Sequence, residues 1–106
     1  MIKAEYSRNG HEHILLVRGH AGYSKRGTDI VCAAVSGIVY SLLGWLENNS
    51  EYTDYVNAEV DDGNVKITCI GGVRAAVALE VTAIGLEQIA DRYPDYVDII
   101  ITGLAG

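Results

Sequence analysis

The chain has 106 residues, with 14 acidic and 8 basic side chains and a net charge of −6. This length predicts a single domain over residues 1–106. The acidic balance argues against a nonspecific nucleic-acid binder, which needs a basic face to displace counterions. No continuous apolar stretch reaches the ~18 residues that cross a bilayer, and the first residues lack a signal-peptide pattern. We therefore expect a cytoplasmic protein that binds neither a membrane nor nucleic acid directly.

The first predicted elements are two strands joined by a tight turn. Residues 2–7 alternate apolar and polar side chains, which is the period of a half-buried strand. The pair Asn9-Gly10 is a strong hairpin signal, and a second strand is expected over residues 12–19. Residues 19–28 contain three glycines, and they predict a mobile loop; two of these glycines lie inside it, Gly22 and Gly27.

The remaining elements are expected in the order helix, strand, strand, helix, strand, over residues 29–49, 52–60, 65–70, 73–92 and 96–101, with a turn over residues 61–64 between the two strands. Asp29 or Thr28 can cap the first helix, and Pro94 prevents continuation of the second. The order ββαββαβ predicts an α+β fold with two layers, in which two helices pack on one face of a five-stranded mixed sheet. The apolar set of the second helix comprises Val77, Val81, Ile84, Leu86 and Ile89.

Two helices are too few to cover both faces of such a sheet. The other face is expected to remain partly apolar, and an exposed apolar face commonly marks an interface. The sequence therefore predicts a homodimer.

Cys32 is the first candidate for chemistry, because it lies in the first turn of the first predicted helix. Backbone N–H groups there lack intrahelical partners, and the helix dipole is positive, so a thiolate is favoured over a thiol. His20 lies twelve residues upstream, at the end of an apolar run beside the glycine-bearing loop. This pair is the minimal equipment of a cysteine hydrolase, in which histidine accepts the thiol proton and later protonates the leaving amine.

Three further residues have candidate supporting roles. Asp29 is close enough to cap the helix or to orient a histidine. Ser36 lies one turn after Cys32 on the same face, where its hydroxyl can bond a substrate or the carbonyl of Cys32. Backbone N–H groups around Ala33 can stabilise an oxyanion.

The other reactive side chains have structural interpretations. Cys69 is in phase with the apolar residues of its strand, and we expect it to be a core residue that forms no disulfide with Cys32. His11 and His13 are interpreted as hairpin-edge histidines, because no third ligand completes a metal site. No phosphate-binding glycine pattern is present, so neither a metal nor a cofactor is expected.

The motif Gly19-His20-Ala21, followed by Gly27-x-Asp29 and the run Ile30 to Ser36, resembles the ribosomal-processing cysteine protease family, Prp. The likeness covers nearly the whole chain. It implies a homodimeric endopeptidase that removes an N-terminal extension from a large-subunit ribosomal protein, which permits ribosome assembly. By position, the family's nucleophile falls on Cys32 and its general base on His20, while Asp29 and Ser36 fall on supporting motif positions. Residues 21–28 match its mobile loop.

Two alternatives to the protease remain open from the sequence. The first is a non-catalytic, ribosome-associated binding module of the same fold, in which Cys32 and His20 do not act together. The second is a redox-sensing thiol protein, although the sequence has no nearby resolving cysteine.

Overall fold

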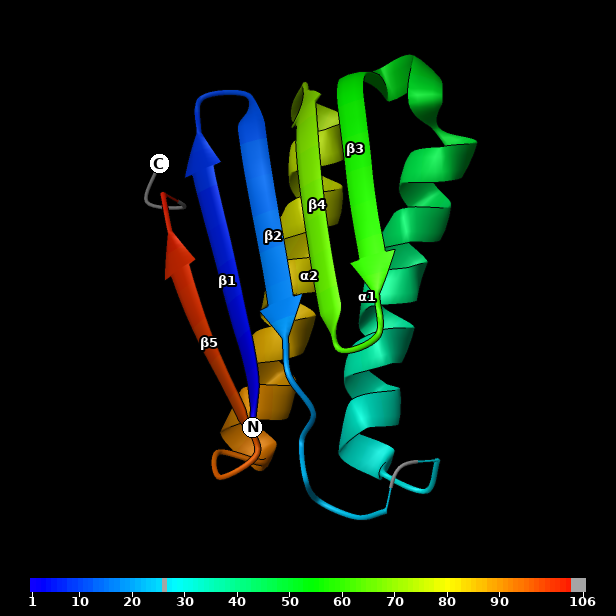
Figure 1. Cartoon of the computed structure of the whole chain (residues 1–106). Helices are drawn as coiled ribbons and strands as arrows, with labels where there is room; N and C mark the ends of the chain where they lie inside the picture. Colours follow the sequence, from blue (N-terminus) through cyan, green and yellow to red (C-terminus); the bar gives the residue numbers. More distant parts are fainter. Residues whose placement is uncertain (26, 104–106) are drawn as a thin grey trace.

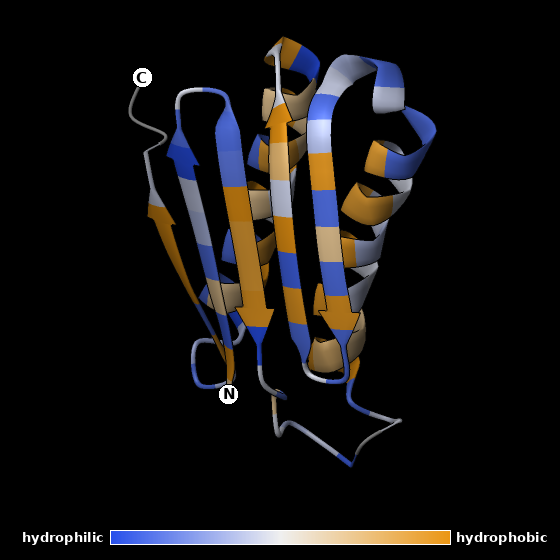
Figure 2. Ribbon diagram, turned by 45° about the horizontal axis from the view of Figure 1, so that its top comes forward, coloured by the Kyte–Doolittle hydropathy of each residue, from blue (hydrophilic) through white to orange (hydrophobic). Residues whose placement is uncertain are grey.

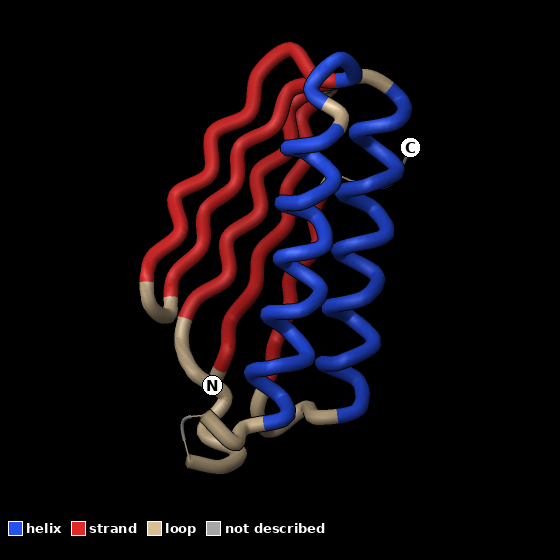
Figure 3. Tube along the Cα trace, turned by 90° about the vertical axis from the view of Figure 1, so that its right-hand side faces the viewer, coloured by secondary structure: helices blue, strands red, loops and turns tan. Residues whose placement is uncertain are grey.

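A five-stranded sheet with both helices on one face forms the two layers of the molecule (Figures 1 and 3). The computed structural model describes residues 1–25 and 27–103. Its elements in chain order are β1 (Ile2–Asn9), β2 (Glu12–Arg18), α1 (Ile30–Asn48), the short 3-10 helix η1 (Ser50–Tyr52), β3 (Thr53–Asp61), β4 (Asn64–Gly71), α2 (Val73–Arg92) and β5 (Val97–Thr102). The predicted α+β class and ββαββαβ order are confirmed.

The strand order is β3-β4-β2-β1-β5, and all neighbours are antiparallel except β1 and β5, which are parallel. This order leaves β3 and β5 at the two edges. It also pairs Arg18 at the end of β2 with Asn64 at the start of β4. The segment that leaves β2 therefore passes the β3–β4 turn, although the two are far apart in the sequence.

The core lies between the sheet and the helices, and β2 is its most continuously hydrophobic strand (Figure 2). In β1, the side chains of Ile2, Ala4 and Tyr6 alternate into this core, as the sequence pattern predicts. The core contribution of α2 differs from its expected apolar set. Of the expected residues, only Leu86 is fully buried. The other buried residues of α2 are three alanines, a leucine and a threonine: Ala75, Ala76, Ala83, Leu79 and Thr82.

The helix α1 corrects one expectation drawn from the sequence. By length and composition, this 19-residue helix is apolar enough to cross a membrane, although no stretch was expected to reach that length. One of its faces packs in the core between the layers, through the buried residues Val31, Val35, Val39, Leu42 and Leu46. This packing is typical of the core helix of a globular domain.

His13 is a second correction, because it is fully buried rather than a hairpin-edge residue. Its Nδ1 atom forms a 2.6 Å hydrogen bond with the hydroxyl of Tyr6 on the neighbouring strand. Its Nε2 atom is buried and has no hydrogen-bond partner among the described residues. Burial, with smaller contributions from Arg8 and His11, lowers the pKa of His13 below its ordinary value. His11 itself is exposed in the turn, as expected for this hairpin.

We predict that His13 makes the fold sensitive to mild acid. Its folded-state pKa lies below its unfolded value of about 6.5, so the stability it supports is present above that pH. This stability is lost as the pH falls from there toward the lowered folded-state pKa. The free energy of unfolding in urea should therefore decrease between pH 7.5 and pH 5.5, and less steeply in a His13→Gln variant. Equal slopes in the two proteins would contradict the prediction.

Candidate active site

Asp29 begins α1 and fixes the backbone around Cys32. Its Oδ1 atom accepts hydrogen bonds from the N–H groups of Val31 and Cys32, at 2.9 and 3.0 Å. Its Oδ2 atom accepts from the N–H groups of Tyr23 and Ser24, at 2.9 and 3.1 Å. Burial alone would raise the pKa of Asp29, but these four N–H groups outweigh burial and lower it. One carboxylate thus joins the start of α1 to the preceding loop.

These bonds correct the expectation that N–H groups around Ala33 stabilise an oxyanion. The N–H of Ala33 donates to the backbone carbonyl of Asp29 at 3.1 Å, and the side chain of Asp29 accepts from the N–H groups of Val31 and Cys32. The first turn of α1 therefore uses these three donors within its own cap.

The Cys32 thiol is half-buried at the start of α1, where it was expected. The backbone N–H of Ala21 donates a 3.3 Å hydrogen bond to its Sγ atom. The residue after His20 therefore already contacts the thiol, so the two motifs identified in the sequence meet in space.

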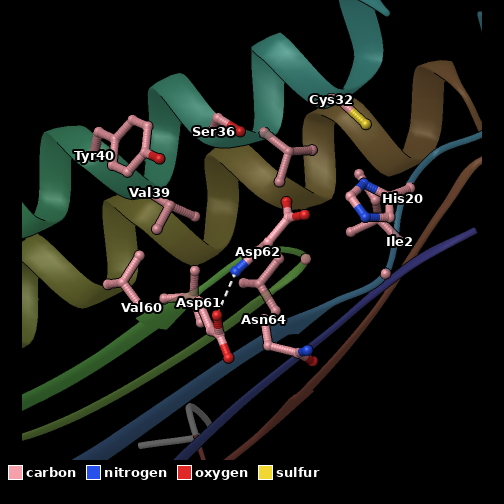
Figure 4. A pocket seen from close by; sticks show the side chains of 15 residues that line it. Ile2, His20, Cys32, Ser36, Val39, Tyr40, Val60, Asp61, Asp62 and Asn64 are labelled. Atoms are coloured by element: carbon pink, nitrogen blue, oxygen red, sulfur yellow. Dashed lines mark hydrogen bonds between the residues drawn. The ribbon is translucent and has the colours of Figure 1, made fainter. Parts of the chain in front are cut away.

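His20 is held by the β3–β4 turn, which the sequence predicted as a turn but not as part of a site. The N–H of Gly19 donates to the carbonyl of Gly63 at 2.8 Å, which brings the two segments together. A Cβ placed on Gly63 would lie 2.9 Å from the Nε2 atom of His20. The imidazole of His20 therefore packs directly against Gly63, where only glycine leaves room for the ring. Cys32 points toward this imidazole from α1 (Figure 4).

Two clefts meet at this pair of side chains. The first, of about 450 Å³, lies between α1 and the β3–β4 turn. The second, of about 480 Å³, lies between α1 and the loop before it, and Gly22 and Gly27 line it. His20, Cys32 and Ser36 line both clefts. A peptide that occupied both clefts would have one of its peptide bonds beside the thiol of Cys32.

The first half of the loop between the two motifs packs against the segment that follows α2. The ring of Tyr23 makes edge contacts with Tyr93 and Tyr96, at centroid distances of 5.7 and 5.1 Å. Gly22 and Gly27 have φ angles of +71° and +92°, which side chains other than glycine rarely adopt. The mobility of this loop stays a prediction, and Arg26 within it lies outside the described residues.

The sequence did not identify the residues that close the first cleft opposite α1. They belong to the β3–β4 turn and the adjoining strand ends, and Asp62 points from this turn toward α1 (Figure 4). These residues are Val60, Asp61, Asp62, Gly63 and Asn64. The only signal for them was the turn itself, because their place beside His20 depends on the order of strands in the sheet. Among the described residues, no three of His, Cys, Asp and Glu are grouped as metal ligands.

A family model described as "Cysteine protease Prp" matches residues 1–98 of the chain. A ribosomal processing cysteine protease Prp from Mycoplasma genitalium is 36% identical over 100 residues, which cover 93% of this chain and 94% of that protein. The protein of the same name from Mycoplasma pneumoniae is also 36% identical, over 92% of this chain and 91% of its own length.

Solved structures share the fold over nearly the whole chain. A ribosomal processing protease Prp from S. aureus, with a covalently linked product peptide, superposes with a TM-score of 0.85 at 20% identity. That match covers 95% of this chain and 99% of the other. A protein from Streptococcus mutans superposes with a TM-score of 0.73 at 27% identity, over 97% and 96% of the two chains.

Proposed function

Because the chain belongs to the cysteine protease Prp family, we propose that Cys32 is its nucleophile and His20 its general base, within one domain over residues 1–106. The observation that carries this assignment is the meeting of both side chains at two clefts, where Ala21 already donates to the thiol. The family supports a peptidase and does not favour the binding-module alternative or the redox thiol.

The proposed reaction follows from these groups. The imidazole of His20 accepts the proton of the Cys32 thiol, and the sulfur attacks the carbonyl carbon of one peptide bond. The C–N bond then breaks, the imidazolium gives its proton to the leaving amine, and a thioester remains on Cys32. Water activated by His20 hydrolyses the thioester and releases the acid. Asp29 acts by holding the start of α1 and the loop, and Ser36 lies where its hydroxyl can contact the substrate in either cleft.

For the substrate, we propose an N-terminal extension of a large-subunit ribosomal protein, processed in the cytoplasm during ribosome assembly. The support is the name of the two curated relatives, both described as ribosomal processing proteases. The test is incubation of the purified protein with a peptide that spans the N-terminal junction of that ribosomal protein from the same organism, with mass spectrometry of the products. One cut at one bond is expected, and a scrambled peptide should stay intact. An uncut junction peptide would overturn the proposed substrate.

We also propose that the protein is a homodimer, with α2 rather than the open sheet face as the interface. The open sheet face is partly apolar, as the sequence predicted, but its Ile14, Leu16 and Ile100 lie among Lys3, Glu5 and Ser7 of β1. The outer face of α2 instead exposes a row of aliphatic side chains at helical spacing: Val73, Val77, Val81 and Ile84, between 45% and 80% exposed. Such a row is typical of an interface.

This surface gives a direct prediction for the oligomeric state. A Val77→Glu, Val81→Glu double variant should elute as a monomer, with its mass measured by light scattering, because it places two charges inside the proposed contact. An Ile100→Glu variant on β5 changes an exposed residue away from α2, and it should remain dimeric. A monomeric wild type, or dissociation by the β5 change alone, would contradict the α2 interface.

A further inference from the structure

The proposed reaction needs a hydrogen-bond donor that the start of α1 does not supply. When the sulfur of Cys32 attacks a carbonyl carbon, one electron pair of the C=O bond moves onto the oxygen and gives it a negative charge. Enzymes commonly stabilise this charge with backbone N–H groups that are already in position. The three N–H groups of residues 31–33 all donate to Asp29 instead. We therefore looked for a donor on another segment beside the sulfur.

Among the described residues, the backbone N–H group that donates to this sulfur belongs to Ala21. The distance from its nitrogen to the Sγ atom of Cys32 is 3.3 Å. In the tetrahedral intermediate, the charged oxygen is bonded to the carbon that the sulfur has attacked, so it lies only two bonds from Sγ. A substrate whose carbonyl oxygen enters on the Ala21 side would place that oxygen within reach of this N–H, where about 2.7–3.1 Å is the effective distance.

The segment that carries this donor is fixed to the rest of the fold on both sides. Before it, the N–H of Gly19 donates to the carbonyl of Gly63 at 2.8 Å. Ala21 itself is only 4% exposed and belongs to the hydrophobic core. After it, the N–H of Tyr23 donates to Asp29 at 2.9 Å. A donor held in this way needs no reorganisation when charge develops, which is the condition for strong stabilisation of an oxyanion.

In the free protein, the sulfur itself occupies the N–H group of Ala21. Ala21 lines neither cleft, but the residues on either side of it, His20 and Gly22, both do. To form the new bond, the sulfur has to turn toward the carbon of a peptide that lies in the clefts. The N–H group is then released in the same step in which the oxygen of the peptide becomes charged.

We infer that the backbone N–H of Ala21 is an oxyanion donor, and so a third catalytic group beside Cys32 and His20. This inference rests on the proposed peptidase function and deepens it. As the C–S bond forms, the electron pair of the C=O bond moves onto the oxygen, and the N–H passes from Sγ to that oxygen. When the C–N bond breaks and the imidazolium protonates the leaving amine, the pair returns to form the C=O bond of the thioester.

The N–H group can be removed alone, because a cysteine follows this segment. A synthetic thioester of residues 1–31 is ligated to residues 32–106 at Cys32, and the product is folded. In the test protein, an ester oxygen replaces the N–H of Ala21. In the control protein, it replaces the N–H of Thr28, which donates at 2.9 Å to Lys25 in the same loop and lies in neither cleft. An all-amide chain made by the same ligation is the reference, and thermal unfolding checks that all three fold.

Two small reagents separate an oxyanion donor from a group that acts on the sulfur alone. 4-Nitrophenyl acetate acylates Cys32 through a tetrahedral intermediate with a charged oxygen, and it releases nitrophenolate. Iodoacetamide alkylates the same sulfur by displacing iodide from a saturated carbon, so no charged oxygen forms. The ester at Ala21 should lower the acylation rate by about tenfold or more, while the alkylation rate stays within about twofold. With the junction peptide, kcat should fall by about 10²-fold and KM should change little.

The ester at Thr28 should leave both rates at the values of the all-amide chain. The inference is overturned if acylation and alkylation slow together in the Ala21 ester, if neither slows, or if the Thr28 ester has the same effect. Neither reagent is a peptide, so a selective loss of acylation supports the donor even if the junction peptide is not cut. If a Cys32→Ala protein is acylated as fast as the all-amide chain, the nucleophile assignment fails and this inference fails with it.

A measurement on the natural chain does not depend on the folding of an ester variant. A trifluoromethyl ketone forms an adduct with a thiol in which the oxygen keeps a negative charge. The amide proton of Ala21 should move downfield in the NMR spectrum when this adduct forms at Cys32, because its N–H then donates to a charged oxygen. Alkylation by iodoacetamide should not produce this shift. An Ala21 amide proton that responds equally to both reagents would overturn the inference.

Discussion

Replacing Cys32 by alanine is expected to lower kcat/KM for the junction peptide by about 10⁴-fold or more, because no other group can form the thioester. His20→Ala should have an effect of similar size, since the thiol then loses the proton acceptor beside it. In the proposed mechanism the two residues act as a unit, so the double variant should be hardly less active than either single one. Initial rates measured by mass spectrometry of the products give all three values.

Cys69 provides the matched control for the thiol. It is the other free cysteine, fully buried in the sheet, and burial raises the pKa of its thiol, which disfavours the reactive thiolate. Cys69→Ala should therefore reduce stability without a comparable reduction in kcat. Cleavage by the Cys32→Ala protein at the wild-type rate would refute the nucleophile assignment, and additive effects of the two single changes would refute the cooperation of His20 with Cys32.

Local signals in the sequence were sufficient for most of the fold. Asn9-Gly10 and the turn over residues 61–64 each mark a hairpin, and both hairpins form. Asp29 was expected as a cap, and it accepts from two N–H groups of α1. These features depend on neighbours within a few residues, where turn and capping chemistry is specific. The same signals placed a cysteine at a helix start and a histidine at a strand end.

Features that depend on the order of strands, or on which face of an element packs in the core, were not predictable from such local signals. The run Ile14 to Val17 is apolar at every position, so it did not show on which face His13 lies. The helix α2 is apolar on two sides, and its alanines rather than its valines face the sheet, because small side chains allow close approach. The Gly63 turn reaches His20 only because β4 pairs with β2.

Gly63→Ala is expected to have the second-largest effect on activity, through His20. Gly63 has a φ of +74°, which costs an alanine about 1–2 kcal/mol. The new Cβ would also lie 2.9 Å from the Nε2 atom of His20, so the imidazole must move away from the turn. Because misplacing a catalytic group by about 1 Å can reduce a rate by about 10²-fold, kcat/KM should fall by roughly 10- to 100-fold.

The turn of the other hairpin separates strain from displacement of the imidazole. Gly10 has a similar φ of +62°, but a Cβ there would meet nothing within 4 Å. Gly10→Ala and Gly63→Ala should therefore lower Tm by similar amounts, about 4–8 °C for each kcal/mol of strain. Only Gly63→Ala should lower kcat/KM, since only that turn holds His20. Equal activity of the two variants would mean that the β3–β4 turn does not position the general base, and that His20 reaches Cys32 from a different place.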